Sequence, residues 1–90
     1  MNKLIVKLNT IEGSKVSRSQ AREVLRGSDE FKIIIFDYEN VPMVGQAFAD
    51  EIYRVFQNAH PNVTIQEENM SAGVKFMVER AKNEAKNQSK

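Results

Sequence analysis

The segment Phe31-Lys32-Ile33-Ile34-Ile35-Phe36-Asp37 decides the fold, because it holds an unbroken run of four large apolar residues at 33–36. A strand with one solvated face alternates apolar and polar residues, whereas an uninterrupted apolar run is typical of a strand buried on both faces. Such strands occupy the centre of a sheet. We therefore expect residues 31–37 to form the central strand of a sheet covered by helices.

Two further strands are predicted on either side of this one in the sequence. Residues 3–8 place apolar side chains at every second position, and residues 63–66 form a short alternating segment. A turn-like Glu12-Gly13-Ser14 cluster also predicts that residues 11–16 close a short hairpin, which would add a fourth strand.

Three helices are predicted between and after the strands. Ser17 and Gln20 form a capping-box sequence, so a first helix should begin there and run to about Arg26, with Gly27 as its stop. A second helix, at 46–58, should end before His60-Pro61. Its apolar residues recur at helical spacing: Phe48, Ile52, Val55, Phe56 and Ala59. The last helix shows the same spacing: Val74, Met77, Val78, Ala81 and Ala85.

The resulting order, β-(β)-α-β-α-β-α, predicts an α/β layer fold with a mostly parallel or mixed sheet of about four strands covered by helices. The 90 residues suffice for one domain, which we place at 1–82. The polar segment 83–90 is expected to be a frayed tail.

Composition excludes several function classes. Thirteen basic residues against twelve acidic ones give a net charge of +1, which does not call for nucleic acid or an anionic membrane as partner. The chain has no cysteine, and His60 is its only histidine, so we expect no metal site, no cofactor and no enzymatic activity. His60 is expected to cap carbonyl groups at a helix end or to face water. No apolar run approaches the ~20 residues of a membrane span, and a cytoplasmic location is expected.

A possible ligand site follows the central strand. Asp37 stands at its carboxyl end, where open α/β sheets place ligands, although capping of the following loop is the favoured interpretation. Gly45 precedes a helix, which allows either tight packing or a positive φ and leaves the next amides, from Gln46 onward, pointing outward. The loop has no other glycine, which disfavours a phosphate cradle.

Three surface features carry weaker signals. Arg18, Arg22 and Arg26 recur every four residues and could bind an anion, although a solvated helix face is the favoured interpretation. Asp50 and Arg54 are spaced for an ion pair on one helix. A large aromatic side chain, that of Phe76, should point away from the core, which hints at a partner or self-association surface.

Residues 36–56 resemble a bacterial family, the STAS-like domain of unknown function, whose signature is close to I-G-Q-x-F-A-D-E-I-F. The matching residues here are Val44-Gly45-Gln46-Ala47-Phe48-Ala49-Asp50-Glu51-Ile52-Tyr53. The segment Ser17-Arg18-Ser19-Gln20-Ala21 also looks like the S-R-S-Q-A element of that family, and the resemblance extends over about residues 4–80.

This family is similar to anti-sigma factor antagonists, in which a sheet covered by helices on one side presents a strand-to-helix loop to a kinase-like ATPase. The resemblance implies a histidine-kinase-type ATP-binding protein acting in trans. In the antagonists a loop serine is phosphorylated. The matching positions 45–48 carry no hydroxyl here, and whether Ser17, Ser19 or Ser71 replaces that serine stays open.

The leading hypothesis is therefore a non-enzymatic, regulatory protein-interaction module that acts in signalling as a monomer or weak homodimer. The expected partner-binding residues lie on the loop and the second helix: Pro42, Met43, Gly45, Gln46, Asp50 and Arg54. The alternative is a small-ligand or nucleotide sensor that uses Asp37, Gly45 and Gln46. Nucleic-acid binding through the three arginines is a third, weaker hypothesis.

Overall fold

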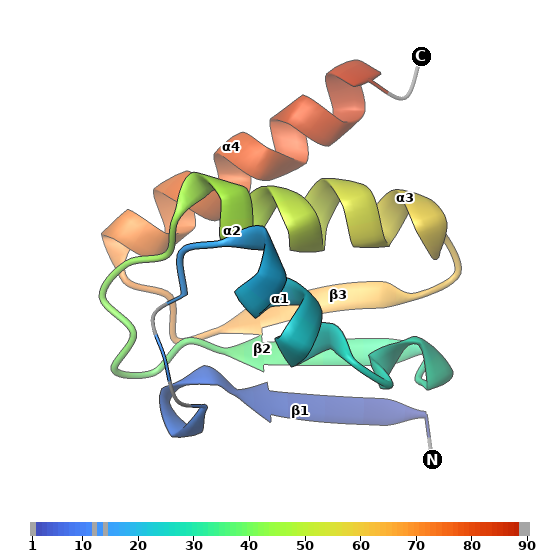
Figure 1. Cartoon of the computed structure of the whole chain (residues 1–90), viewed down its shortest axis with the longest axis horizontal. Helices are drawn as coiled ribbons and strands as arrows, with labels where there is room; N and C mark the ends of the chain where they lie inside the picture. The colour runs from blue at the N-terminus through green and yellow to red at the C-terminus, as the bar shows by residue number, and fades with distance from the viewer. Residues whose placement is uncertain (1, 12, 14, 89–90) are drawn as a thin grey trace.

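The computed structural model describes residues 2–11, 13 and 15–88, and it is built on a three-stranded, all-parallel sheet (Figure 1). The strands are β1 (Lys3–Lys7), β2 (Ile33–Asp37) and β3 (Thr64–Glu68), in the spatial order β1-β2-β3. The expected central strand is thus confirmed. Both crossovers pass through helices, as parallel strands require.

Three predictions about the strands need correction. The sheet of the described residues has three strands rather than four, and β3 continues two residues beyond the predicted end. Leu8, expected in the first strand, begins the short 3₁₀ turn η1 (Leu8–Thr10). Glu12 and Ser14 of the predicted hairpin lie outside the described residues, and the described residues between 11 and 16 form no strand.

Helix α1 (Arg18–Leu25) begins as predicted. Ser17 Oγ accepts a hydrogen bond from the Gln20 amide at 3.2 Å, and Gln20 Oε1 accepts one from the Ser17 amide at 3.0 Å, which completes the capping box. The helix ends at Leu25, Arg26 is its C-cap, and Gly27 follows with φ +77°, a left-handed conformation that glycine adopts without strain. A second 3₁₀ turn, η2 (Ser28–Glu30), leads into β2.

The second helical segment is continuous but changes its geometry. It consists of α2 (Gln46–Asp50), the π-helical stretch η3 (Glu51–Phe56) and α3 (Gln57–Ala59). The wider π turns move the buried face, so Tyr53 is buried while Val55 and Ala59 are exposed. The prediction that Val55 and Ala59 face the core is therefore wrong. The segment ends at Ala59, before His60, as expected, and the His60 ring Nδ1 lies 3.1 Å from the Phe56 carbonyl oxygen.

Helix α4 (Ala72–Gln88) packs Val74, Val78 and Ala81 into the core. It extends six residues beyond the predicted domain end at 82, so residues 83–88 are helical. Phe76 is 63% exposed on the opposite side of the helix, as predicted. Among the described residues, no helix is both long and apolar enough to cross a bilayer.

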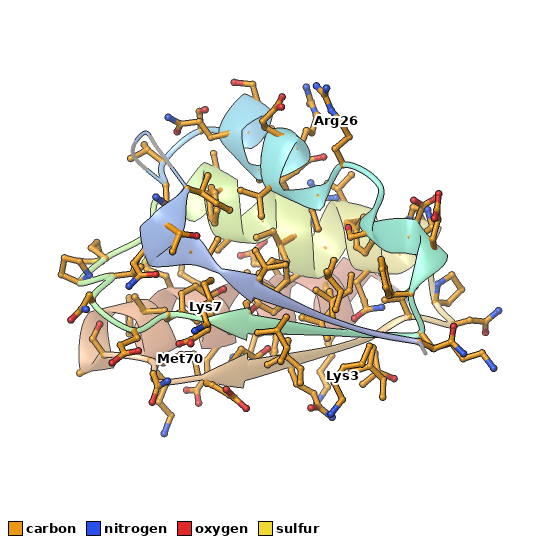
Figure 2. All side chains as sticks on the ribbon, turned by 90° about the horizontal axis from the view of Figure 1, so that it is seen from below. Lys3, Lys7, Arg26 and Met70 are labelled. Carbon is orange, nitrogen blue, oxygen red and sulfur yellow. The ribbon has the colours of Figure 1, made fainter. Side chains whose placement is uncertain are left out.

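All the helices lie on one face of the sheet, and the core fills the space between them and that face (Figure 1). Alternation directs Ile34 and Phe36 into this core, where both are fully buried. Ile33 and Ile35 point to the other face, which no described helix covers (Figure 2). The expected burial of the central strand on both faces is confirmed, because Ile35 on this other face is only 5% exposed although no described helix covers it.

A polar cluster is enclosed between the sheet and the helices. The hydroxyls of Tyr38 and Tyr53 are hydrogen-bonded at 2.9 Å, and burial raises the pKa of both groups above that of a free tyrosine. Beside them Glu67, on the helix-facing side of β3, pairs with Lys82 of α4 at 3.1 Å. This pair joins the edge strand to the last helix.

Candidate functional site

The connection from β2 to α2, residues 38–45, lies at the carboxyl end of the sheet (Figure 1). Val41 and Val44 are buried, whereas Pro42 and Met43 between them are exposed, Met43 to 58%. Two buried anchors therefore hold a short apolar tip in solvent. Carboxyl ends of parallel strands are the usual place for binding sites in α/β folds.

Hydrogen bonds fix this loop from the β3 side. The Tyr38 amide donates to the Glu68 carbonyl oxygen at 2.9 Å, and the Val41 amide donates to the Tyr38 carbonyl oxygen at 2.9 Å. Ser71, just before α4, donates from Oγ to the Pro42 carbonyl oxygen at 3.0 Å. The loop is thus tied to the segment that follows β3.

Gly45 fixes the loop from the other side. Its amide donates to the Lys15 carbonyl oxygen at 2.7 Å, and the Phe48 amide donates to the Val16 carbonyl oxygen at 3.0 Å. A Cβ on Gly45 would lie 2.7 Å from that Val16 oxygen, closer than van der Waals contact allows. Because φ is −79°, close packing and not a positive φ requires glycine here.

The segment that Gly45 holds in place adds a second exposed apolar side chain. Val16 is 55% exposed, and it lines a hollow of about 390 Å³ together with Pro42 and Met43. We call Val16, Pro42 and Met43 the loop patch. Sequence reasoning did not single out Val16, because its only signal was a place next to a helix cap.

Asp37 caps this loop, as the favoured interpretation predicted. Its Oδ1 accepts hydrogen bonds from the Asn69 side chain and from the Glu39 amide, both at 3.0 Å. The Asn69 bond, followed by the Glu39 bond, lowers the pKa of Asp37 below that of a free aspartate. Asp37 is 8% exposed, and its Oδ1 already accepts hydrogen bonds from other residues of the chain.

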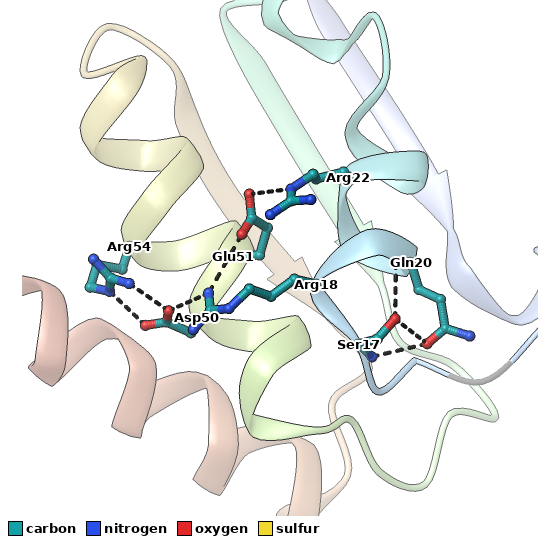
Figure 3. A network of polar contacts seen from close by, with 7 residues as sticks. All are labelled: Ser17, Arg18, Gln20, Arg22, Asp50, Glu51 and Arg54. Atoms are coloured by element: carbon teal, nitrogen blue, oxygen red, sulfur yellow. Dashed lines mark hydrogen bonds and ion pairs between the residues drawn. The ribbon is translucent and has the colours of Figure 1, made fainter.

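A network of ion pairs joins α1 to the second helical segment (Figure 3). Arg54 donates to Asp50 from Nε at 2.7 Å and from Nη2 at 2.8 Å, which confirms the predicted pair and makes it bidentate. Arg18 donates to the same carboxylate at 2.7 Å. These bonds, that of Arg54 first, lower the pKa of Asp50 below its ordinary value, and they raise the pKa of both arginines.

Glu51 extends the network. It is 7% exposed and lies 3.5 Å from Arg18 and 3.3 Å from the Nε of Arg22. Arg26 instead pairs with Glu23 at 2.8 Å and lies at the C-cap, outside the helix proper. The three arginines therefore do not form one free basic stripe, since each already pairs with a carboxylate of the chain. No local sequence pattern indicates that Glu51 is the partner of Arg18 and Arg22.

The network borders a second hollow, also of about 390 Å³. It is lined by side chains from three helices: Arg18, Gln46, Ala47, Asp50, Arg54 and Glu84. The structure thus divides the expected partner-binding residues into two neighbouring groups. One hollow is lined by Pro42, Met43 and Gly45, and the other by Gln46, Asp50 and Arg54.

Within the described part of the chain, no three histidine, aspartate or glutamate side chains are grouped so that they could hold a metal ion. The site therefore consists of an apolar tip, a network of ion pairs and two hollows.

This architecture, a parallel sheet with helices on one face and a rigid strand-to-helix loop at its carboxyl end, is of the STAS-like α/β class. The model of the family described as the STAS-like domain of unknown function matches residues 20–75, more than half of the chain, and the chain belongs to that family. The match includes the loop and α2 but not β1. No curated protein and no solved structure matches the chain.

Proposed function

We propose that the chain is a non-enzymatic regulatory module that binds a protein partner through the β2–α2 loop and the adjoining helix. The observation that carries this proposal is the exposure of Met43, to 58%, and of Val16, to 55%, on a backbone fixed from both sides. Interfaces combine an apolar centre with a polar rim. The loop patch supplies the first, and the network around Asp50 supplies the second.

Rigidity supports the same function. A loop that is already ordered loses little conformational entropy when a partner binds, so a small apolar tip can contribute usefully to affinity. Methionine also adapts its shape to a partner surface. Pro42 and Met43 would make the apolar contacts, and Gln46, Asp50 and Arg54 would supply hydrogen bonds at the rim.

The proposed partner is a histidine-kinase-type ATP-binding protein supplied in trans, as the resemblance to anti-sigma factor antagonists implies. Positions 45–48, which match the phosphorylated loop of those proteins, are Gly, Gln, Ala and Phe. Binding would therefore not be released by phosphorylation at these positions. Ser71 Oγ already holds the loop through Pro42, so a phosphate on Ser71 would break that contact.

The test is capture of partners from native lysate on the tagged chain, followed by binding of the purified captured protein. Met43→Ser and Gln46→Arg should each reduce retention of an ATP-binding protein by tenfold or more. Phe76→Ser is the matched control, because Phe76 is equally exposed on another surface. Retention that is unchanged by both loop variants, or lost only with Phe76→Ser, would contradict the proposed site.

A second candidate function is small-ligand sensing, which the hollows on the two sides of the loop favour. The one on the β3 side measures about 510 Å³ and is lined by Tyr38, Asn40, Met70 and Ser71 among others. A ligand that binds only the folded chain raises its thermal midpoint. A midpoint raised by a nucleotide or metabolite panel would support this candidate, and a midpoint unaffected by the panel would oppose it.

A further inference from the structure

The face of the sheet opposite the helices is open in the described chain. Figure 2, seen from below, shows the strands in front of α4, with α1 beyond the β1 edge. All-parallel sheets occur almost only where both faces are covered. The second face of this three-stranded parallel sheet therefore lacks a cover that its topology leads one to expect.

Register places nine residues on this face in three rows across the strands. The rows are Lys3, Ile33 and Thr64; Ile5, Ile35 and Gln66; and Lys7, Asp37 and Glu68. The apolar residues of this face are Ile33 and Ile35 on the central strand and Ile5 on the β1 edge. Ile5 is 54% exposed, Ile33 is half-buried and Ile35 is 5% exposed, and none of the three belongs to the cluster of side chains packed beneath the helices.

Charge is distributed unevenly over the face. One edge, β1, carries Lys3 and Lys7, whereas the other edge, β3, carries Glu68 and no basic residue. Asp37, between them in the last row, is already hydrogen-bonded to Asn69. The face is therefore basic along one edge and acidic at the opposite corner.

We propose that this face packs against the same face of a second copy of the chain, with the two-fold axis parallel to the strands. Rotation about such an axis exchanges the edges and keeps the rows level. Because Lys7 and Glu68 lie in one row, Lys7 of each copy then faces Glu68 of the other. Ile33 and Ile35 of each copy meet their counterparts at the axis, whereas Ile5 faces Gln66 of the other copy.

The charge pattern selects this arrangement over the other face-to-face dimer. A two-fold axis across the strands would place β1 against β1 with reversed direction, so that Lys3 of each copy would face Lys7 of the other. Like charges directly opposite each other are destabilising, and opposite charges stabilise the pair. With the axis parallel to the strands, two Lys7–Glu68 contacts flank the Asp37 side chains that meet at the axis, whereas the other axis gives two repulsive Lys3–Lys7 contacts and no attractive one.

The contact is small. Strands about 4.8 Å apart that rise about 3.3 Å per residue give a face of roughly 15 by 17 Å, about a third of the ~800 Å² that each partner buries in a standard interface. We therefore expect a weak dimer that forms at high protein concentration. The loop patch lies outside the nine-residue face, so dimer formation and partner binding use separate surfaces.

Sedimentation equilibrium of the full chain, from ~10 µM to ~1 mM at low salt, tests the proposal. Ile33→Lys should abolish the dimer, because it places two like charges opposite each other at the axis. Lys7→Glu and Glu68→Lys should each weaken it roughly tenfold, because each change turns two attractive contacts into repulsive ones. The double variant with both changes restores opposite charges and should recover most of the wild-type affinity.

The Lys7→Glu variant also distinguishes between the two possible orientations of the two-fold axis. With an axis across the strands, Lys7→Glu would replace a repulsion by an attraction and strengthen the dimer. Phe76→Ser, on an outer helix surface, is the control and should leave the dimer unchanged. A wild-type chain that stays monomeric at 1 mM, a dimer strengthened by Lys7→Glu, or one lost only with Phe76→Ser would overturn the proposal. Circular dichroism identifies any variant that fails to fold. In that case the two exposed charge variants, Lys7→Glu and Glu68→Lys, decide whether the proposed dimer forms.

Discussion

Gly45→Ala should destabilise the chain even though its backbone is in a region that alanine adopts freely. At φ −79° and ψ 159° an alanine would, on backbone entropy alone, stabilise the fold by about 0.4–1 kcal/mol. The new Cβ, however, would lie 2.7 Å from the oxygen and 2.8 Å from the Cα of Val16. Both are backbone atoms, so no side-chain rotation relieves the contact.

The two segments must therefore separate by several tenths of an ångström. That movement weakens the hydrogen bonds from Gly45 to Lys15 and from Phe48 to Val16, each with a net contribution of about 0.5–1.5 kcal/mol. We expect a net loss of about 1–3 kcal/mol in the free energy of unfolding, measured by urea denaturation. For a domain of this size, that loss lowers Tm by roughly 5–20 °C.

Gly27→Asn is the matched control. Gly27 has φ +77° and no atom within 4 Å of an added Cβ, and asparagine tolerates the left-handed region. Its cost should stay below about 1 kcal/mol. A Gly45→Ala variant as stable as the wild type, or more stable, would refute the close approach of the loop to residues 15–16.

Three further predictions concern buried and charged groups. Asp50→Asn should cost about 1–3 kcal/mol in urea denaturation, because two arginines lose their partly buried partner, whereas Glu23→Gln in an exposed pair should cost less than about 0.5 kcal/mol. The pKa values of Asp37 and Asp50 are lowered in the folded chain, so the unfolded chain takes up protons first as the pH falls. The ionised carboxylates therefore stabilise the fold fully above about pH 5, and this contribution is lost progressively below about pH 4. In an acid titration, Asp37→Asn should flatten the dependence of the free energy of unfolding on pH. Tyr38 and Tyr53, the only tyrosines, have raised pKa values, so tyrosinate absorbance should appear only together with alkaline unfolding and not at pH 10 in the folded chain.

The fold was predictable where one local signal determined each element. The apolar run at 33–36 identified the central strand, and the residues Ser17 and Gln20 identified the start of α1 through a capping box that needs no tertiary contact. Pro61 fixed the end of the second helical segment in the same way.

Other features depend on tertiary structure and left no local signal. The π-helical stretch moves Tyr53 inward and Val55 outward, although the sequence spacing fits a regular helix. The open face was hidden because Ile33 and Ile35 have the same hydrophobicity as Ile34, and an apolar run does not tell which face the helices cover. The sheet of the described residues has three strands, and this number likewise depends on the pairing of strands far apart in the sequence.

The candidate site was predictable in part for the same reasons. The pair Asp50–Arg54 follows from helical spacing alone, and the capping role of Asp37 follows from the chemistry of loops. The contacts of Glu51 with two arginines of α1 required knowledge of how the helices pack. So did the reason for Gly45, since the backbone that excludes a side chain comes from residue 16.

An NMR titration of the ¹⁵N-labelled chain with the captured ATP-binding protein tests the proposed binding surface most directly. We predict that the amide signals of residues 41–46 and of α2 shift or broaden on binding, together with that of Val16. Signals of Ile5 and Ile35 on the open face should stay in place at the low chain concentration used. Shifts confined to that face or to the outer side of α4, with none at the loop, would contradict the account.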